Sequence, residues 1–225
     1  MRVRDNIAAA FNEEFDKALA EDVRRSGLPI SSWFKGGVTN PETMVDQWRA
    51  LGPKAVKNFI DWWDVGGYKV WITPDGKPAI ELELEVPFGR VPVKMVIDLV
   101  AVKNNELLVI DTKSGAKVPE SMQQVALYAC GMEKAYGVRP AKGSFFMARG
   151  AGYKKDIFLT EPRSLADWQY SSEFFTQQFE AMEASIAAGG HQLARVGKHC
   201  ERCDVAAGCS AVGGWLAPRY DRVAG

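Results

Sequence analysis

The spacing of apolar residues divides the chain into a helical first third and a strand-rich middle. Between residues 5 and 23 apolar side chains recur at every fourth position, as on one face of a helix: Ile7, Phe11, Phe15, Leu19 and Val23. Two prolines, each suited to a first helical turn, then predict helices over residues 41–48 and 53–63. We therefore expect residues 1–65 to form a helical region.

From residue 66 onward, short apolar runs alternate with turn residues. They predict four consecutive strands in an antiparallel meander, over residues 68–72, 79–86, 91–102 and 107–113. A helix is expected over 119–136, further strands over 143–149 and 156–159, and a long helix over 166–188. The predicted fold class is mixed α/β in a single domain, with a core over residues 66–188 and a cysteine-containing tail over 189–225.

Composition and charge exclude several classes of function. Lys plus Arg and Asp plus Glu each number 28 in 225 residues, so a formal net charge of zero excludes a globally basic nucleic-acid coat or a polybasic membrane binder. No apolar run reaches the roughly 18 to 20 residues of a membrane span, and the first five residues lack the apolar core of a secretory signal. We expect a soluble, cytoplasmic protein with no membrane partner.

Two acids within the apolar strands give the strongest chemical signal, because a buried carboxylate needs compensation. If the turn between the two strands is centred between Asn104 and Asn105, the residue numbers of cross-strand partners sum to 209, as those of Asp98 and Asp111 do. Opposed Cβ atoms lie about 4.5 to 5.5 Å apart, close enough for the carboxylates to share a divalent cation. The two-residue period also places Lys113 on the face of Asp111.

This constellation suits phosphodiester chemistry. Without a cation the two carboxylates repel each other and one must hold a proton. With Mg²⁺ or Mn²⁺ the pair becomes favourable, and Lys113 adds a fixed positive charge near a phosphate under attack by water. The structural alternative is an ion pair of Asp111 with Lys113 and an Asp98 that caps loop amides; the matching register of the second acid favours the phosphodiesterase centre.

The next helix adds Gln124 and Tyr128, one turn apart on the same face. An aspartate after an apolar strand, the run Ile-Asp-Thr-Lys-Ser-Gly at 110–115, and Gln-Gln-Val-Ala-Leu-Tyr-Ala at 123–129 together resemble the PD-(D/E)XK nuclease superfamily. The resemblance is to its RecB-like exonuclease branch, which includes the AddB nuclease domain, CRISPR-associated exonucleases and phage-encoded relatives.

The resemblance implies a restriction-endonuclease-like core, with a mixed β-sheet flanked by helices. It implies metal ligation by Asp98, Asp111 and the backbone carbonyl of Thr112, with Mg²⁺ or Mn²⁺ as the ion. It also implies that Lys113 activates or positions the attacking water, and that Gln124 and Tyr128 lie near the active site and the DNA.

The cysteines extend the resemblance. Cys200, Cys203 and Cys209 are spaced like the C-terminal cluster that holds a [4Fe-4S] cluster together with an N-terminal cysteine in many members. No cysteine precedes Cys130 here, and that residue is either a fourth ligand or a small core residue. Zinc, held by the three tail cysteines and either His191 or His199, is the alternative.

Family members also carry a helical histidine near the N-terminus, and the only histidines here are at 191 and 199. Either the chain is short at its N-terminus or the ligand has been lost. The first reading predicts a metal-dependent DNA exonuclease, acting on DNA ends or single strands in phage or bacterial recombination, repair or replication, with partner proteins of those processes. The second predicts a catalytically inactive DNA-binding or assembly subunit; a restriction-type endonuclease is a third alternative.

A local basic patch is expected to contact the DNA. Residues 137–155 contain no acid and five basic side chains, which attract the phosphate backbone: Arg139, Lys142, Arg149, Lys154 and Lys155. The aromatic residues of this segment are interpreted as core, with at least one of Phe145 and Phe146 pointing inward.

Overall fold

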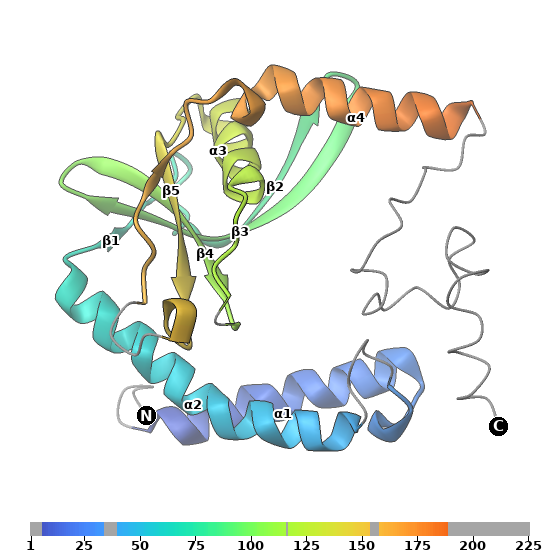
Figure 1. Ribbon diagram of the computed structural model, residues 1–225, viewed down its shortest axis with the longest axis vertical. Coiled ribbons are helices and arrows are strands. Elements are labelled where there is room, and N and C mark those ends of the chain that lie inside the picture. Colours follow the sequence, from blue (N-terminus) through green and yellow to red (C-terminus); the bar gives the residue numbers. More distant parts are fainter. Residues whose placement is uncertain (1–5, 34–39, 116, 154–157, 189–225) are drawn as a thin grey trace. The chain divides into compact units, whose positions relative to one another are not determined.

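The computed structural model describes residues 6–33, 40–115, 117–153 and 158–188 (Figure 1). The chain divides into two compact units, Ala55–Gly190 and a second made of Met1–Lys54 with His191–Gly225. The single-domain organisation stays a prediction. In the described part of the chain, no helix combines the length and apolarity needed to cross a bilayer.

The N-terminal unit begins with α1 (Ile7–Ser26), which confirms the helix predicted from its four-residue apolar period. The side chain of Asn6 caps its start by accepting a hydrogen bond from the Ala9 amide, and Gly27 ends it in the left-handed conformation at φ 66°. A 3₁₀ turn, η2 (Ile30–Ser32), follows. The rings of Phe11 and Phe15 stack on α1 with centroids 5.5 Å apart.

A single helix, α2 (Pro41–Gly66), replaces the two helices predicted over 41–48 and 53–63, so the predicted break was wrong. Pro53 lies inside it and removes one amide donor without ending the helix. Packing on both sides of the proline outweighs its low propensity. A Cβ on Gly52 would collide with Cζ of Phe11, and Phe59 packs on the sheet of the Ala55–Gly190 unit, to which it belongs.

The Ala55–Gly190 unit is built on a six-stranded mixed sheet. Its strands are β1 (Lys69–Val70), β2 (Ile80–Phe88), β3 (Val91–Lys103), β4 (Glu106–Lys113), β5 (Lys142–Met147) and β6 (Arg163–Ser164). β2, β3 and β4 form the predicted antiparallel meander, β5 runs parallel to β4, and β6 is antiparallel to β5. The mixed α/β fold class is confirmed.

The first predicted strand does not extend the meander. β1 and β2 lie one after the other along the same edge of β3, with Val70 opposite Ala101 and Ile80 opposite Leu99. Residues 72–78 loop out between them, closed by a bridge from Ile72 to Pro78. The 13 residues of β3 leave room for both short partners, which is why β1 pairs with β3.

Helices cover both faces of this sheet. On one face α3 (Gln123–Tyr136) packs against the buried residues of β2 to β5, including Ile97 and Val109 (Figure 1). On the other face Phe59 and Trp62 of α2 pack against Phe146. Phe145 and Phe146 are both buried, at 1% and 0% exposure, so both predicted core aromatics point inward, on opposite faces.

The remaining elements differ at their ends from the predictions. α3 begins at Gln123 rather than at 119, and α4 (Ser172–Ala187) follows a 3₁₀ turn, η4 (Trp168–Tyr170), because Ser171 caps its first turn. A further turn, η3 (Ala151–Tyr153), follows β5. The strand predicted over 156–159 falls partly outside the described residues, and Leu159 forms an isolated bridge with Phe146. β6 was not predicted.

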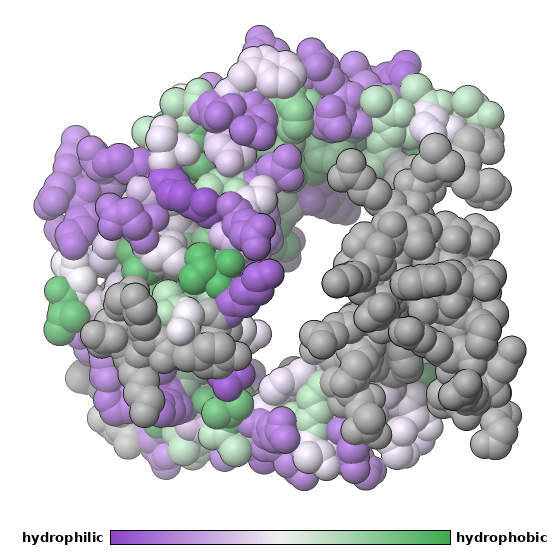
Figure 2. Space-filling view, in the orientation of Figure 1, coloured by the Kyte–Doolittle hydropathy of each residue, from purple (hydrophilic) through white to green (hydrophobic). Residues whose placement is uncertain are grey.

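On the face drawn in Figure 2, hydrophilic side chains cover the end of the sheet where β3 turns into β4, and apolar side chains appear as small separate patches. This distribution agrees with a core that lies between the sheet and its helices.

Candidate active site

The turn between β3 and β4 sets the register of the site. Asn104 and Asn105 have φ of 51° and 64°, the two positive values that a type I′ hairpin turn requires and asparagine tolerates. Leu99 therefore faces Ile110, and the numbers of these two residues sum to 209 as predicted. The predicted register is confirmed.

Three carboxylates lie in one row across β2, β3 and β4. Continuing the β3–β4 register by one residue places Asp98 opposite Asp111, and the β2–β3 register places Glu81 opposite Asp98. Asp111 in turn aligns with Phe145 on β5. The row crosses the sheet where the regular pairing of β3 with β4 ends.

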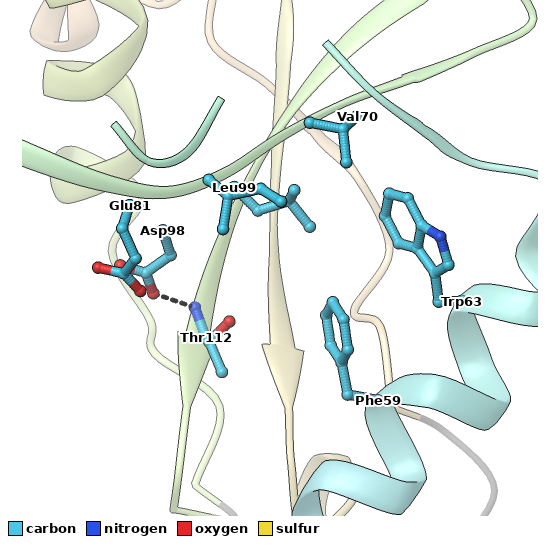
Figure 3. A pocket seen from close by; sticks show the side chains of 8 residues that line it. Phe59, Trp63, Val70, Glu81, Asp98, Leu99 and Thr112 are labelled. Carbon is cyan, nitrogen blue, oxygen red and sulfur yellow. Dashed lines mark hydrogen bonds between the residues drawn. The ribbon is translucent and has the colours of Figure 1, made fainter. Parts of the chain in front are cut away.

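Asp98 is half-buried and its Oδ2 accepts a hydrogen bond of 2.7 Å from the backbone amide of Thr112 (Figure 3). This bond joins β3 to β4 beyond the last regular pair and orients the carboxylate. The contact matches the structural alternative, in which Asp98 caps an amide. The same contact would also orient a carboxylate that binds a metal. It is therefore compatible with both the structural and the metal-binding interpretation of Asp98.

Asp111 is only 2% exposed, and its Oδ2 has no hydrogen-bond donor among the described residues. The Lys113 ammonium lies 2.7 Å from that oxygen as an ion pair, but off the direction that a hydrogen bond needs. Burial raises the pKa of Asp111 above the ordinary value, and the charge of Asp98 raises it further, against the opposing effect of Lys113. A buried carboxylate oxygen with spare acceptor capacity is suited to a cation.

Lys113 is held from the other side by α3. Its Nζ donates to Oε1 of Gln124 at 2.9 Å, and Nε2 of Gln124 donates to the Tyr128 hydroxyl at 2.9 Å. Burial raises the pKa of Tyr128, and the charges of Asp111 and Asp98 add to this effect. The structure thus brings Asp111, Lys113, Gln124 and Tyr128 into one chain of contacts.

Sequence reasoning missed Glu81. It alternates with Glu83 and Glu85 along β2 and so has the pattern of a solvent-facing strand residue. Its φ of 46° is unusual for a non-glycine residue in a strand and turns the chain locally. The register of the β2–β3 hairpin carried the missing signal, since counting from its turn at Gly89 and Arg90 pairs Glu81 with Asp98.

A pocket of about 310 Å³ opens beside the acids. Its lining joins the polar residues Glu81, Asp98 and Thr112 to an apolar wall of Phe59, Trp63, Val70, Ile80 and Leu99. Figure 3 shows the two carboxylates on one side of the pocket and the two aromatic rings on the other, with Leu99 between them.

Comparison with known proteins decides which family this arrangement belongs to. The model of the PD-(D/E)XK nuclease superfamily matches residues 4–210, which is most of the chain. The chain belongs to this superfamily. The restriction-endonuclease-like fold is therefore confirmed. Nucleases of this superfamily hydrolyse phosphodiester bonds and use divalent metals such as Mg²⁺ or Mn²⁺.

Two phage proteins are similar to this PD-(D/E)XK chain. The Gene 69 protein of Mycobacterium phage D29 is 33% identical over 178 residues, covering 79% of this chain and 64% of the phage protein. The Gene 69 protein of Mycobacterium phage L5 is 32% identical over 222 residues, covering 88% of this chain and 73% of the phage protein. The chain thus spans slightly less than two thirds of the D29 protein, and the names of the two phage proteins specify no activity.

The residues of this candidate site fit a hard divalent cation. Among the described residues, no three His, Cys, Asp or Glu side chains are grouped as a metal site. Mg²⁺ does not need such a group, because it keeps several waters and binds through one or two carboxylates. The spare Oδ2 of Asp111 is the observation that fits; Asp98, Asp111 and the Thr112 carbonyl remain the predicted ligands.

The structure separates the basic residues predicted to bind DNA. The Arg139 guanidinium donates to Sγ of Cys130 at 3.2 Å, to Glu133 at 2.8 Å and to the carbonyls of Tyr170 and Leu165 at 2.8 and 3.4 Å. These contacts favour a structural role for Arg139 over a contact with DNA. Cys130 itself is fully buried in the core.

Lys142 and Arg149 lie at opposite ends of the β5 segment. Lys142 starts β5 beside Leu108, pairs with Glu106 at 2.9 Å, and is roughly 16 Å along the strand from the level of Lys113. Arg149 is exposed and follows Ala148, whose amide donates to the Lys113 carbonyl. Of these two, only Arg149 follows the end of β5 that aligns with Lys113.

The remaining residues predicted to bind DNA or a metal lie outside the described residues. These are the DNA-binding candidates Lys154 and Lys155, the cysteines Cys200, Cys203 and Cys209, and the histidines His191 and His199. The [4Fe-4S] and zinc alternatives for the tail therefore stay predictions.

Proposed function

We propose that the protein is a Mg²⁺- or Mn²⁺-dependent DNA nuclease of the RecB-like type. It is proposed to be an exonuclease that acts from DNA ends in phage or bacterial recombination, repair or replication. The observation that carries the proposal is the pair of aligned acids, Asp98 and Asp111, next to a lysine held by Gln124. The superfamily match and the phage relatives support it.

Each side chain of the site has a proposed role. When bound, a divalent cation would supply Lewis-acid polarisation of the scissile phosphate. Asp98 and Asp111 would hold that cation, with Asp98 oriented by the Thr112 amide. Lys113 would stabilise charge that develops on the phosphate and orient the attacking water, because its ammonium is fixed between Asp111 and Gln124. Tyr128 would keep Gln124 in place.

Arg149 is proposed to contribute to a DNA-binding surface, together with Lys154 and Lys155. Exposed basic side chains attract the backbone regardless of sequence, and their contribution falls with salt. We further propose that the three tail cysteines bind a [4Fe-4S] cluster, or zinc in its place, and that this metal site has a structural role.

The test uses the full chain and labelled linear and circular DNA. Linear DNA should be shortened in Mn²⁺ or Mg²⁺, covalently closed circles should persist, and EDTA should stop the reaction. Asp111→Asn and Lys113→Met should lose activity while the control Asp61→Asn, an exposed carboxylate paired with Lys57, keeps it. Discrete cuts in circles would favour a restriction-type endonuclease. Salt-sensitive DNA binding without cleavage would favour the inactive assembly subunit.

A further inference from the structure

The pocket beside the acids has a composition that hydrolysis alone does not explain. Of the described residues, eight line the pocket; five of these are apolar, and none of the eight is Lys, Arg or His. Ile80 is 53% exposed although it borders the site. A large apolar side chain at the edge of a concave pocket is typical of a ligand contact.

Ring contacts hold the aromatic wall of the pocket in place. The rings of Phe59 and Trp63, one helical turn apart on α2, stack at 6.0 Å with an angle of 18°. The Phe59 ring is also held edge-on by Phe146, at 5.1 Å and 84°. Phe59 and Trp63 are only half-buried, so they keep surface for a ligand while the core fixes their orientation. Such a wall accepts a flat partner without reorganising.

The polar side of the pocket defines what the ligand must be. Asp98 and Thr112 line the pocket and also belong to the candidate catalytic centre, so an occupant of the pocket and a phosphate at the centre are neighbours. The described residues of the apolar side offer no cation to a phosphate, and the Glu81 carboxylate repels one. The part of a nucleotide that is flat, apolar on its faces and adjacent to a phosphate is the base.

We propose that this pocket is a nucleobase subsite that receives a base next to the scissile phosphate, against Trp63 and Phe59. The inference rests on the proposed function and specifies its substrate. A base enters such a pocket only when it is unpaired and unstacked, so the strand being cut must be single-stranded or frayed at this point. Aromatic stacking accepts every base, so the subsite positions the strand without reading its sequence.

The experiment measures binding of single-stranded oligonucleotides to the full chain, with Ca²⁺ in place of Mg²⁺ to slow cleavage. One abasic nucleotide is stepped through the oligonucleotide. The proposal predicts one position at which the missing base weakens binding by about 5- to 150-fold, the range of one aromatic stack. A uniform effect, or no binding of single strands, would overturn it.

Two variants assign that effect to the pocket. Ile80→Asn should weaken binding of the intact oligonucleotide but not of the one that lacks the critical base, because both changes remove the same contact. The matched control is Ile72→Asn, since Ile72 is 54% exposed and does not line the pocket. Trp63→Leu should act as Ile80→Asn does, and Ile80→Asn carries the test if the tryptophan variant does not fold.

The outcomes separate the subsite from the nuclease activity. A base-sensitive position without cleavage in Mn²⁺ would refute the proposed function and leave the subsite standing. Cleavage without a base-sensitive position would refute the subsite alone. If Ile80→Asn lowers the melting temperature far more than Ile72→Asn and leaves DNA binding unchanged, the pocket is filled by the protein itself and the proposal fails.

Discussion

Replacing Asp111 with asparagine should change stability in opposite directions with and without a divalent cation. The Asp111 carboxylate is 2% exposed and its Oδ2 lacks a hydrogen bond, so its charge is unfavourable in the metal-free protein. An unsatisfied buried polar group costs about 1 to 3 kcal/mol, and the ion pair with Lys113 returns part of that cost. We expect Asp111→Asn to raise the free energy of unfolding by about 1 kcal/mol, or the melting temperature by about 2 to 4 °C.

A bound cation should reverse the order of stability of wild type and Asp111→Asn. A ligand that binds only the folded state adds about 2.7 kcal/mol when present at 100 times its Kd. Wild-type protein should gain this increment in Mn²⁺ and Asp111→Asn should not. The variant should then be less stable than wild type by about 2 kcal/mol, the difference between the two effects.

The pH dependence of the metal-free proteins follows from the raised pKa of Asp111. Because the folded chain binds this proton more tightly than the unfolded chain, wild type loses stability as the pH rises through the raised pKa. The gain in free energy of unfolding from Asp111→Asn should vanish below the ordinary pKa of about 4. It should grow as the pH rises from there to the raised pKa of Asp111, and stay constant at higher pH.

The assay is urea denaturation of both proteins in EDTA and in Mn²⁺, with Asp61→Asn as control. The exposed Asp61 pairs with Lys57. Its substitution should therefore change the free energy of unfolding by less than about 0.5 kcal/mol, both in EDTA and in Mn²⁺. If Asp111→Asn is destabilising in EDTA, or gains as much from Mn²⁺ as wild type, then Asp111 is a structural ion-pair residue and not a cation ligand.

Three further substitutions test the roles of Lys113, Glu81 and Arg139 separately. Lys113→Met should lower the rate of DNA hydrolysis by about 10²- to 10³-fold while keeping the Mn²⁺-dependent rise in melting temperature; loss of both would mean that the lysine builds the site. Glu81→Gln should weaken Mn²⁺ stabilisation by less than about tenfold in Kd, because the exposed Glu81 is screened by water, and an effect as large as that of Asp111→Asn would make it a direct ligand. Arg139→Met should lower the free energy of unfolding by about 2 to 3 kcal/mol and leave DNA affinity unchanged, since its donors are used within the protein; weaker DNA binding at full stability would return it to the DNA surface.

The sequence predicted the site best at the β3–β4 hairpin, where the residues of the turn set the register of the two strands. Asn104 and Asn105 adopt the positive φ values of a tight turn, and that turn fixes which residues of β3 and β4 face each other. The alignment of Asp98 with Asp111 could therefore be counted from the sequence. The same count across the β2–β3 hairpin would have found Glu81, whose alternation with other glutamates concealed it.

Other features depend on contacts that no local pattern encodes. The acceptors of Arg139 include carbonyls 26 and 31 residues away, so its sequence neighbourhood gave it the pattern of a DNA-binding residue. Pro53 predicted a helix start because the packing of α2 on both sides of it cannot be seen locally. The apolar wall of the pocket joins residues of α2, β1, β2 and β3, which are far apart in the sequence, so no local pattern could predict it.

The most direct measurement is the rate of hydrolysis of labelled linear DNA by the full chain across a Mn²⁺ titration, in parallel with Asp111→Asn. A metal-dependent nuclease predicts no hydrolysis in EDTA, a rise that saturates over the Mn²⁺ range that raises the melting temperature, and no hydrolysis by the variant at any concentration. Hydrolysis that persists in EDTA, or equal rates for wild type and Asp111→Asn, would contradict it.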